Sequence, residues 1–224
     1  DRVCVNIPPR HGKSQLVSIF YPAWFLGRNP DKKVMMVSHT TDLAVDFGRK
    51  VRNLIGVADY KEIFPDVSLA VDSKSAGRWN TNFGGEYFAC GIGSALAGRG
   101  ADLLLVDDPH SEQDVINGNF SVFDKAYEWF TFGARTRLMP GGRVAIVQTR
   151  WHMDDLTGRV TDDMVKNELS DQYEIVEFPA LLDSDDGTKK PLWPEFFDLA
   201  ALERTKASMP AFQWNSQYQQ QPTA

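Results

Sequence analysis

Three consecutive residues near the amino terminus, Gly12, Lys13 and Ser14, are of the types that phosphate binding requires. Gly12 lets the backbone turn so that its N–H groups can face an anion, Lys13 supplies a point charge, and Ser14 supplies a hydroxyl ligand for Mg²⁺. The spacing departs from the usual phosphate-binding loop, because Ile7 stands where the first glycine of that loop belongs. A chance triplet of this kind in a surface loop is common, so the neighbouring elements must decide whether it marks a site.

Those neighbouring elements favour a site. The apolar run 3–7 predicts a strand before the triplet, and a helix is expected from Ser14 onward. Further along, the apolar residues 103–106 predict a buried parallel strand that ends in Asp107 and Asp108. Ligands of open α/β sheets bind at the carboxyl ends of the strands, so these acids should lie near the triplet. Two solvated acids at a strand end are the alternative, which the upstream triplet disfavours.

The two acids should divide the work of nucleotide hydrolysis. Asp107 would hold Mg²⁺, directly or through water, because a hard ion prefers oxygen ligands. Asp108 would lie over the γ-phosphate and orient the attacking water. Many ATPases of this kind carry Glu at the second position, and Asp is shorter by one bond, about 1.5 Å of reach. Either the backbone compensates for this difference or Asp108 is a poorer base.

A third strand is expected at 143–149. It ends in Gln148 and Thr149, and either residue could sense the γ-phosphate in an ATPase with an additional strand between the loop strand and the acidic strand. A strand that ends in Thr is ordinary, so this signal is weak by itself.

The rest of the pattern alternates strands with helices. Repeated strand–helix–strand units predict a mostly parallel α/β sheet with helices on both faces, as in P-loop NTPases of the additional-strand, RecA-like and helicase-like type. Residues 78–81 and 86–92 are expected to form a hairpin, and 182–190 an acidic and polar loop. Further strands are predicted at 33–38 and 173–179. The predicted helices are 14–26, 41–55, 119–138, 156–164, 198–208 and 211–220.

Length and composition are those of one ordinary globular α/β domain. The chain has 224 residues, of which 42% are hydrophobic and 24% charged, and a net charge of −6. This acidic balance argues against a broad basic face for nucleic acid, although a few DNA contacts in a channel are compatible with it. The apolar stretch 16–26 is too short to span a bilayer and contains Pro22. The chain opens directly on a strand, as an excised domain would.

Cysteines, histidines and tryptophans are interpreted as structural residues. The two cysteines, Cys4 and Cys90, lie in apolar strand patterns and should be buried thiols. The four histidines have no metal-ligand spacing with the cysteines. Core packing is the expected role of five scattered tryptophans, which are Trp24, Trp79, Trp129, Trp193 and Trp214.

Several segments together resemble the ATPase domain of the large terminase subunit of tailed bacteriophages. The resemblance covers nearly the whole chain, and the set of segments is far more specific than any single one. The segments that carry it are 8–14, 94–109, 148–152, 154–156 and 217–222.

This resemblance implies a role for each matched residue. The residues implied to bind the nucleotide are Pro9, Arg10, His11, Gly12, Lys13, Ser14 and Gln15. Those implied to act in catalysis are Lys13, Asp108, Arg99 and Arg10, the last of which can contact the γ-phosphate. Ser14 and Asp107 would hold Mg²⁺. The residues implied to couple hydrolysis to movement are Gln148, Thr149 and Arg150.

Arg99 resembles the family's candidate arginine finger, which reaches the nucleotide of a neighbouring subunit. It stands between Gly98 and Gly100, and a charge on such a loop can extend outward. The alternative is that Arg99 is a solvated loop residue.

The resemblance also implies a function. We expect ATP hydrolysis, with Mg²⁺, to drive double-stranded DNA through a portal protein into an empty procapsid. Residues 1–217 would form the ATPase domain, and 218–224 the start of a linker to a nuclease domain that this chain lacks. The expected partners are DNA, the portal and procapsid, the small terminase subunit and further copies in a ring, without a membrane. The expected location is the cytoplasm of the infected host cell, docked at the procapsid portal and not in the mature virion.

Three other functions stay open. Another helicase-like or RecA-like ATPase would unwind DNA without any capsid partner. A P-loop kinase would need an acceptor pocket and a lid, and no basic lid segment is evident in the sequence. A nucleotide-binding scaffold with little turnover is kept open by the short side chain of Asp108.

Overall fold

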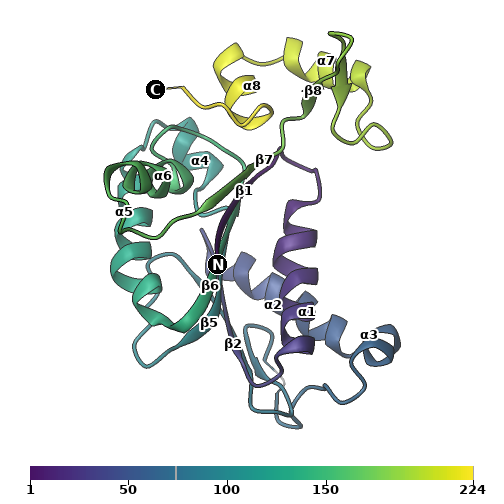
Figure 1. The fold of residues 1–224 in the computed structure, drawn as a ribbon, viewed down its shortest axis with the longest axis vertical. Coiled ribbons are helices and arrows are strands. Elements are labelled where there is room, and N and C mark those ends of the chain that lie inside the picture. Colours follow the sequence, from purple (N-terminus) through teal and green to yellow (C-terminus); the bar gives the residue numbers. More distant parts are fainter. Residues whose placement is uncertain (74, 224) are drawn as a thin grey trace. The chain divides into compact units, whose positions relative to one another are not determined.

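The computed structural model describes residues 1–73 and 75–223, and its strands and helices alternate along the chain (Figure 1). The strands are β1 (Arg2–Asn6), β2 (Lys33–Ser38), β3 (Arg78–Asn80), β4 (Glu86–Gly91), β5 (Ala101–Asp107), β6 (Leu138–Gln148), β7 (Glu174–Glu177), β8 (Leu181–Asp183) and β9 (Lys189–Pro191). The α-helices are α1 (Tyr21–Arg28), α2 (Thr41–Ile55), α3 (Ala58–Ile63), α4 (Glu112–Ile116), α5 (Ser121–Glu128), α6 (Leu156–Lys166), α7 (Leu199–Ala207) and α8 (Ala211–Gln217). Further helical segments are the π-helical η1 (Gln15–Phe20) and η2 (Trp129–Ala134) and the 3₁₀ turn η3 (Arg135–Arg137).

A seven-stranded sheet organises the described residues, in the order β3-β4-β2-β5-β6-β1-β7. Strand β2 is parallel to both β4 and β5, and β1 is parallel to β7, whereas β3 and β4 form the predicted antiparallel hairpin. The order confirms that a strand, β6, lies between the loop strand β1 and the acidic strand β5. The mostly parallel α/β sheet predicted from the sequence is therefore present.

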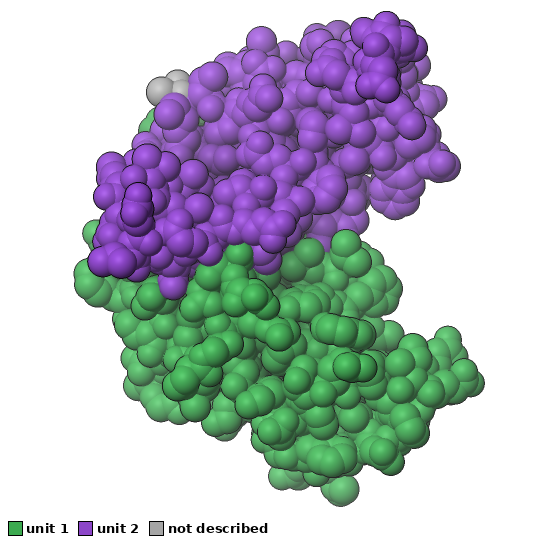
Figure 2. Space-filling model, viewed as in Figure 1, with its two compact units in different colours: residues 1–2, 14–146 green, residues 3–13, 147–224 purple. Residues whose placement is uncertain are grey.

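The chain divides into two compact units, which Figure 2 colours separately. Unit 1 comprises residues 1–2 and 14–146, and unit 2 comprises residues 3–13 and 147–224. Each unit is assembled from two separate stretches of chain, and β1 and β6 both contribute residues to each of them. Because the chain crosses between the units within strands and loops of the fold, no linker segment separates them in the sequence. The composition along the chain therefore does not reveal the boundary.

Unit 1 is built around β2 and β5, whose side chains are buried on both faces of the sheet. Val34 lies opposite Leu103 and Val37 opposite Val106, and all four side chains are at most 1% exposed. Helix α2, capped by the Thr40 hydroxyl, packs against β2 and β4. Its buried face consists of residues at helical spacing, which are Ala44, Phe47, Val51 and Ile55.

Unit 2 contains the parallel pair β1 and β7, helix α6, and a carboxyl-terminal group of elements. In Figure 1 β8, α7 and α8 lie together beyond the end of β7. A small core joins them through Ala180, Leu181, Leu202 and Trp214. The amide of Gln219 accepts from the Leu181 N–H and donates to the Leu181 carbonyl, both at 3.1 Å. Of the predicted linker start, 218–224, residue 224 lies outside the described residues, and Gln219 is fixed to unit 2.

Two predicted helices contain segments that are not α-helical. The helix expected over 14–26 begins with η1, because Pro22 has no N–H to donate one turn back and Tyr21 N donates to the Leu16 carbonyl, five residues earlier. The helix expected over 119–138 divides into α5, η2 and η3. Gly133 weakens its middle, and the Thr131 hydroxyl bonds the Tyr127 carbonyl at 2.9 Å. Within residues 1–73 and 75–223, no helix is both long enough and apolar enough to cross a bilayer.

The prediction of an acidic and polar loop over 182–190 is wrong. Strands β8 and β9 form a small antiparallel hairpin there, with Leu182 opposite Lys190. The turn is closed by Gly187, which has a φ of 79°, and by the Thr188 N–H, which donates to the Asp186 carboxylate at 2.9 Å. An Asp-Gly pair is a hairpin signal. The surrounding charged residues concealed it, because strand prediction relied on apolar alternation.

The two cysteines are buried thiols, as the sequence predicted. Cys4 is fully buried and Cys90 is 2% exposed. Burial raises the pKa of each thiol to about 12, so both stay protonated and unreactive at neutral pH.

Candidate functional site

The predicted phosphate-binding loop follows β1 and turns sharply at two residues. Gly12 has a φ of 81° and Arg10 a φ of 62°, which places both in the left-handed region. Gly12 adopts this conformation without strain because it has no Cβ, whereas Arg10 is a non-glycine residue with an exposed side chain. Left-handed residues that alternate with others gather backbone N–H groups around an anion. The loop therefore has backbone turns that favour phosphate binding.

His11 is the buried residue of this loop. Its ring is 6% exposed, and Nδ1 donates to the Pro9 carbonyl at 2.8 Å. Burial, with a contribution from the Lys13 charge, lowers the pKa of His11, so the imidazole is neutral at pH 7. Nε2 is then a buried acceptor without a hydrogen-bond partner among the described residues. His11 thus fixes the loop from within, while the positive charge of the loop comes from Arg10 and Lys13.

The acidic strand β5 brings Asp107 against the helix that follows the loop. Asp107 is fully buried, and its Oδ2 accepts a hydrogen bond from Ser18 Oγ. Ser18 lies one helical turn after Ser14, which is the N-cap residue of η1. No group of three or more His, Cys, Asp or Glu side chains forms a metal site among the described residues. Hydroxyl and carboxylate oxygens suit Mg²⁺, which keeps several waters, so Ser14 and Asp107 fit this ion by their donor chemistry.

Asp108 turns the backbone away from the line of the strand. Its φ is 40°, in the left-handed region that Asp adopts more readily than most residues. His39 Nδ1 donates to the Asp108 carbonyl at 3.1 Å. Since His39 directly follows β2, the strand beside β5 helps to hold this conformation. The short Asp108 side chain thus occurs together with a left-handed backbone turn. Such a turn is what would be needed to compensate for the reach that Asp lacks relative to Glu.

Gln148 and Thr149 lie at the end of β6, where the sequence predicted a phosphate sensor. Thr149 Oγ1 donates to the Ile7 carbonyl at 3.0 Å, and Ile7 N donates to the Gln148 carbonyl at 3.1 Å. The Gln148 side chain is 1% exposed, and its amide nitrogen and oxygen have no partner among the described residues. A phosphate oxygen could accept from the nitrogen and a water could donate to the oxygen. Gln148 therefore fits a ligand bound next to the loop.

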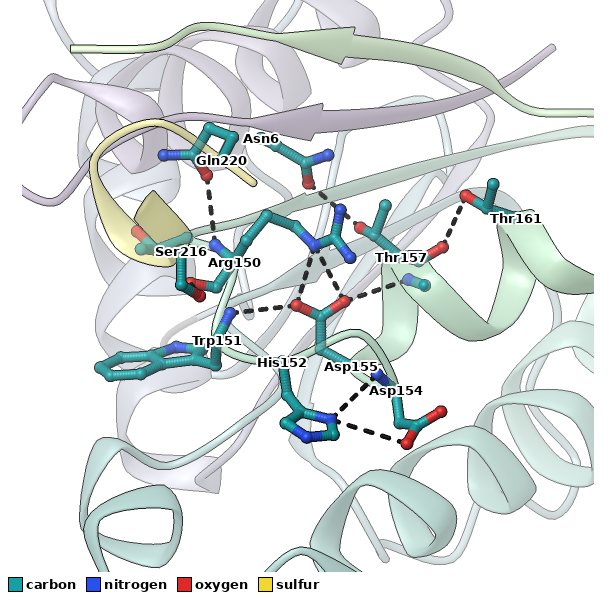
Figure 3. A network of polar contacts seen from close by, with 12 residues as sticks. Asn6, Arg150, Trp151, His152, Asp154, Asp155, Thr157, Thr161, Ser216 and Gln220 are labelled. Carbon is teal, nitrogen blue, oxygen red and sulfur yellow. Dashed lines mark hydrogen bonds and ion pairs between the residues drawn. The ribbon is translucent and has the colours of Figure 1, made fainter. Parts of the chain in front are cut away.

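Arg150, the last of the three predicted coupling residues, is held inside unit 2 (Figure 3). Its Nε donates to both carboxylate oxygens of Asp155 at 3.0 and 2.8 Å, and the two side chains are 10% and 0% exposed. Asp155 also accepts from the Trp151 N–H at 3.1 Å and from the Gly158 N–H at 3.0 Å, so it caps α6. A Cβ at Gly158 would lie 1.6 Å from the Met153 carbonyl oxygen, so only glycine fits this turn.

The backbone of Arg150 connects the same network to the end of the chain. Its N–H donates to Gln220 Oε1 at 3.2 Å, and its carbonyl accepts from Ser216 Oγ at 2.9 Å (Figure 3). Gln220 is 1% exposed, so this contact is buried. The residue after the predicted phosphate sensor is thus bonded both to the start of α6 and to the segment around α8. Displacement of the end of β6 would move both elements.

Asp155→Ala should destabilise the domain by about 3–5 kcal/mol, because it leaves the buried Arg150 guanidinium without its main charge partner. Chemical denaturation followed by circular dichroism measures this loss. Asp154→Ala is the matched control, since that carboxylate is 54% exposed and lies 3.6 Å from His152 Nδ1 and 3.7 Å from Arg159 Nε, longer than the contacts of Asp155 with Arg150. We expect less than about 1 kcal/mol for the control. Equal losses of stability in the two variants would argue against a stabilising role of the buried Arg150–Asp155 ion pair.

Arg99 is paired within its own chain. Its Nη1 lies 2.8 Å from Glu86 Oε1, and its guanidinium lies 4.3 Å from the centre of the Phe88 ring. The side chain is 24% exposed. The description of Arg99 as a solvated loop residue therefore does not hold. Its action on a neighbouring subunit stays a prediction, and it would require the guanidinium to leave Glu86.

The chain matches one protein family over almost its whole length. The family model described as "Terminase large subunit, T4likevirus-type, N-terminal" matches residues 4–222, a range that includes the loop, the acidic strand and the coupling residues. The chain belongs to the terminase large subunit family. None of the curated proteins matches it.

Solved terminase structures share the fold of this terminase domain. The large terminase of bacteriophage HK97 is 16% identical with a TM-score of 0.61, and the match covers 98% of this chain and 46% of that one. A mutant ATPase domain of the Thermus phage P74-26 large terminase is 17% identical, with a TM-score of 0.59 over 99% of this chain and 89% of that one. The large terminase of another thermophilic bacteriophage, in complex with ATP-γ-S, is 11% identical, with a TM-score of 0.58 over 96% of this chain and 46% of that one.

These likenesses confirm the predicted P-loop, RecA-like fold. At identities between 11% and 17% they establish the fold and nothing about activity. The chain spans about half the length of the HK97 terminase and of the terminase bound to ATP-γ-S, with 46% of each covered.

Sequence reasoning missed several residues that hold the terminase site in place. Ser18, which bonds Asp107, could have been found because it lies one helical turn after Ser14. His39, which bonds the Asp108 backbone, directly follows a strand, as the two acids do. Glu86, the partner of Arg99, gives no sequence signal, because its pairing depends on which strands become neighbours.

Proposed function

We propose that this domain binds and hydrolyses ATP as the motor of a DNA-packaging terminase. Family membership over residues 4–222 carries the proposal, because the matched part contains both the phosphate-binding loop and the acidic strand. The left-handed turns at Arg10 and Gly12 and the unsatisfied amide of Gln148 support a phosphate ligand. One of the similar terminases, from a thermophilic bacteriophage, was solved both with ATP-γ-S and with ADP, which makes an adenine nucleotide the natural choice.

In this proposal each site residue has a distinct task. Lys13 and Arg10 bind the terminal phosphates and balance the charge that develops during transfer. Ser14 and Asp107 would hold Mg²⁺, which neutralises phosphate oxygens when it is bound. Asp108 positions the attacking water and accepts its proton. Pro9, His11 and Gln15 shape the loop and the start of η1, and Gln148, Thr149 and Arg150 pass the state of the phosphate to α6 and to the segment around α8.

The mechanical part of the proposed function is that of a large terminase subunit of full length, such as the solved terminases of which this chain covers 46%. We infer that hydrolysis drives double-stranded DNA through a portal into a procapsid, with the small terminase subunit and further copies in a ring as partners. The active location would be the host cytoplasm, at the portal and not in the mature virion. With the longer terminase, portal and procapsids, DNA should become resistant to nuclease only when hydrolysable ATP is present. Unwinding without any capsid requirement would instead favour another helicase-like ATPase.

Asp107→Asn and Asp108→Asn should fail at different steps of hydrolysis. Loss of a metal ligand in Asp107→Asn should weaken Mg²⁺-dependent nucleotide binding, whereas Asp108→Asn should keep binding and stop phosphate release. Nucleotide-binding curves with and without Mg²⁺, together with phosphate release, separate these effects. Ser18→Ala is the control, because it removes the hydrogen bond to Asp107 but keeps the carboxylate. Equal loss of binding in both Asn variants would refute the division, and an unaltered chain that neither binds nor hydrolyses ATP would refute the proposed function.

A nucleotide-binding scaffold with little turnover is the second candidate, and the short carboxylate of Asp108 is the observation that favours it. Its distinguishing sign is tight nucleotide binding by the unaltered chain without phosphate release, even under conditions that assemble rings. If reach is what limits turnover, Asp108→Glu should raise phosphate release and leave binding unchanged.

A further inference from the structure

Two tryptophans expected in the core are instead nearly half exposed, and one of them lies beside the phosphate-binding loop. Trp79 and Trp214 are buried at 1% and 3%, as predicted, but Trp24 and Trp193 are 49% and 41% exposed. Trp193 stacks on Phe196 with ring centres 4.9 Å apart, and Phe196 is 58% exposed. Both rings belong to the segment between β9 and α7, residues 193–197, which we call the aromatic turn.

The aromatic turn is fastened on its inner side by backbone hydrogen bonds and core packing. The N–H groups of Phe196 and Phe197 both donate to the Trp193 carbonyl, at 3.1 and 2.9 Å. Leu192 N donates to the Ala180 carbonyl at 2.9 Å, which fixes the start of the turn. Phe197 packs against the small core of unit 2 and meets Phe196 edge to face at 4.8 Å. The two exposed rings are therefore presented on an anchored backbone, which lowers the entropy lost when a ligand covers them.

The aromatic turn lies beside the phosphate-binding loop at two consecutive residues, His11 and Gly12. The Phe197 ring stacks on His11 with centroids 4.8 Å apart and planes 20° from parallel. The Trp193 ring lies 3.9 Å from the point that a Cβ on Gly12 would occupy. Gly12 directly precedes Lys13, the residue assigned to the terminal phosphates. The aromatic turn and the phosphate-binding loop are thus neighbours within unit 2.

We propose that Trp193 and Phe196 form the stacking surface for the purine base of the nucleotide whose phosphates bind at the loop. This inference rests on the proposed nucleotide binding and adds the subsite for the base. A nucleotide held by its phosphates brings its own base to the neighbouring surface, so continuity with the loop selects this occupant over a separate partner. Covering the two rings also removes exposed apolar area from water. Because every base has a π-face, the surface should accept adenine and guanine alike.

The test compares ligands with and without a base. Trp193→Ala and Phe196→Ala should each weaken ADP and GDP binding between about fivefold and about a hundredfold, the range that stacking on one aromatic side chain gives. Binding of inorganic pyrophosphate, which has no base, should stay unchanged. Isothermal titration calorimetry with Mg²⁺ measures all three ligands. Trp193→Phe should keep most of the affinity, and Phe212→Ala, which removes an exposed ring of α8, is the matched control and should change nothing.

Each outcome separates this inference from the function on which it rests. Unchanged ADP binding in both alanine variants overturns the stacking surface, and so does an equal loss of pyrophosphate binding, which would mean that the loop itself was disturbed. Tighter ADP binding in Trp193→Ala also overturns it, because the ring would then obstruct the loop. An unaltered chain that binds neither ADP nor pyrophosphate contradicts the proposed nucleotide binding instead. Phe196 is 58% exposed, so its alanine variant should fold even if Trp193→Ala does not.

Discussion

Lys13→Ala should reduce ATP hydrolysis by at least about 100-fold while the fold stays intact. The ammonium is required where negative charge develops on the transferred phosphate, and removal of one such group from an active site costs about 10²–10³ in rate. Lys13 is half-buried at the start of the helical segment that follows Gly12 and does not belong to the apolar core, so its loss should leave the melting temperature nearly unchanged. In the longer terminase the same variant should leave no nuclease-resistant DNA. Phosphate release and circular dichroism on one preparation check both statements.

The matched control for this substitution is Lys50→Ala. Lys50 is 50% exposed on α2, where it pairs with Asp46, and its removal should cost well under about 1 kcal/mol and no activity. Both variants lose one positive charge, so any effect of net charge appears equally in the two. Hydrolysis by Lys13→Ala near the rate of the unaltered chain would show that the loop is not the phosphate site.

The features that the sequence predicted well depend on local pattern. The run 3–7, the triplet Gly12 to Ser14 and the strand before Asp107 each combine apolar periodicity with residues of special backbone or charge, and all three elements are present. The position of β6 between β5 and β1 was also expected, because additional-strand P-loop ATPases have a strand between the loop strand and the acidic strand. Helix α2 was predicted at its observed bounds, since one face carries apolar residues at strict helical spacing.

The features that the sequence did not predict depend on contacts between distant residues. Exposure of Trp193 could not be foreseen, because a large aromatic residue usually packs in a core and only the turn before α7 brings it to the loop. The role of Asp155 as the partner of Arg150 was likewise hidden, since an acid at a helix start is expected to cap the helix whatever else it binds. For both Trp193 and Asp155, the role depends on residues that are neighbours only in the folded structure, so the residue type alone does not indicate it.

Under conditions that assemble rings, Arg99→Ala should bind ATP normally and lose hydrolysis by about 10³–10⁵, the contribution of an arginine finger where one has been measured. The structure sets a condition for this result. Arg99 is bonded to Glu86 at 2.8 Å and stacked over Phe88, so an isolated chain should be a slow ATPase. Contact with a neighbouring subunit would have to draw the guanidinium away from Glu86. Phosphate release per molecule should therefore rise with protein concentration or with added portal.

Mixing two inactive variants decides whether Arg99 acts on a neighbour. Arg99→Ala subunits keep their own phosphate-binding loop, and Lys13→Ala subunits keep Arg99, so a ring that contains both should recover part of the hydrolysis that neither has alone. Glu86→Gln is the control for a purely structural role, because it removes the charge partner but leaves the arginine. A finger predicts that Glu86→Gln keeps its activity, whereas a structural anchor predicts the same defect as Arg99→Ala. If rings form and the mixture stays as inactive as its two components, the guanidinium serves only to fasten the loop before β5 to β4.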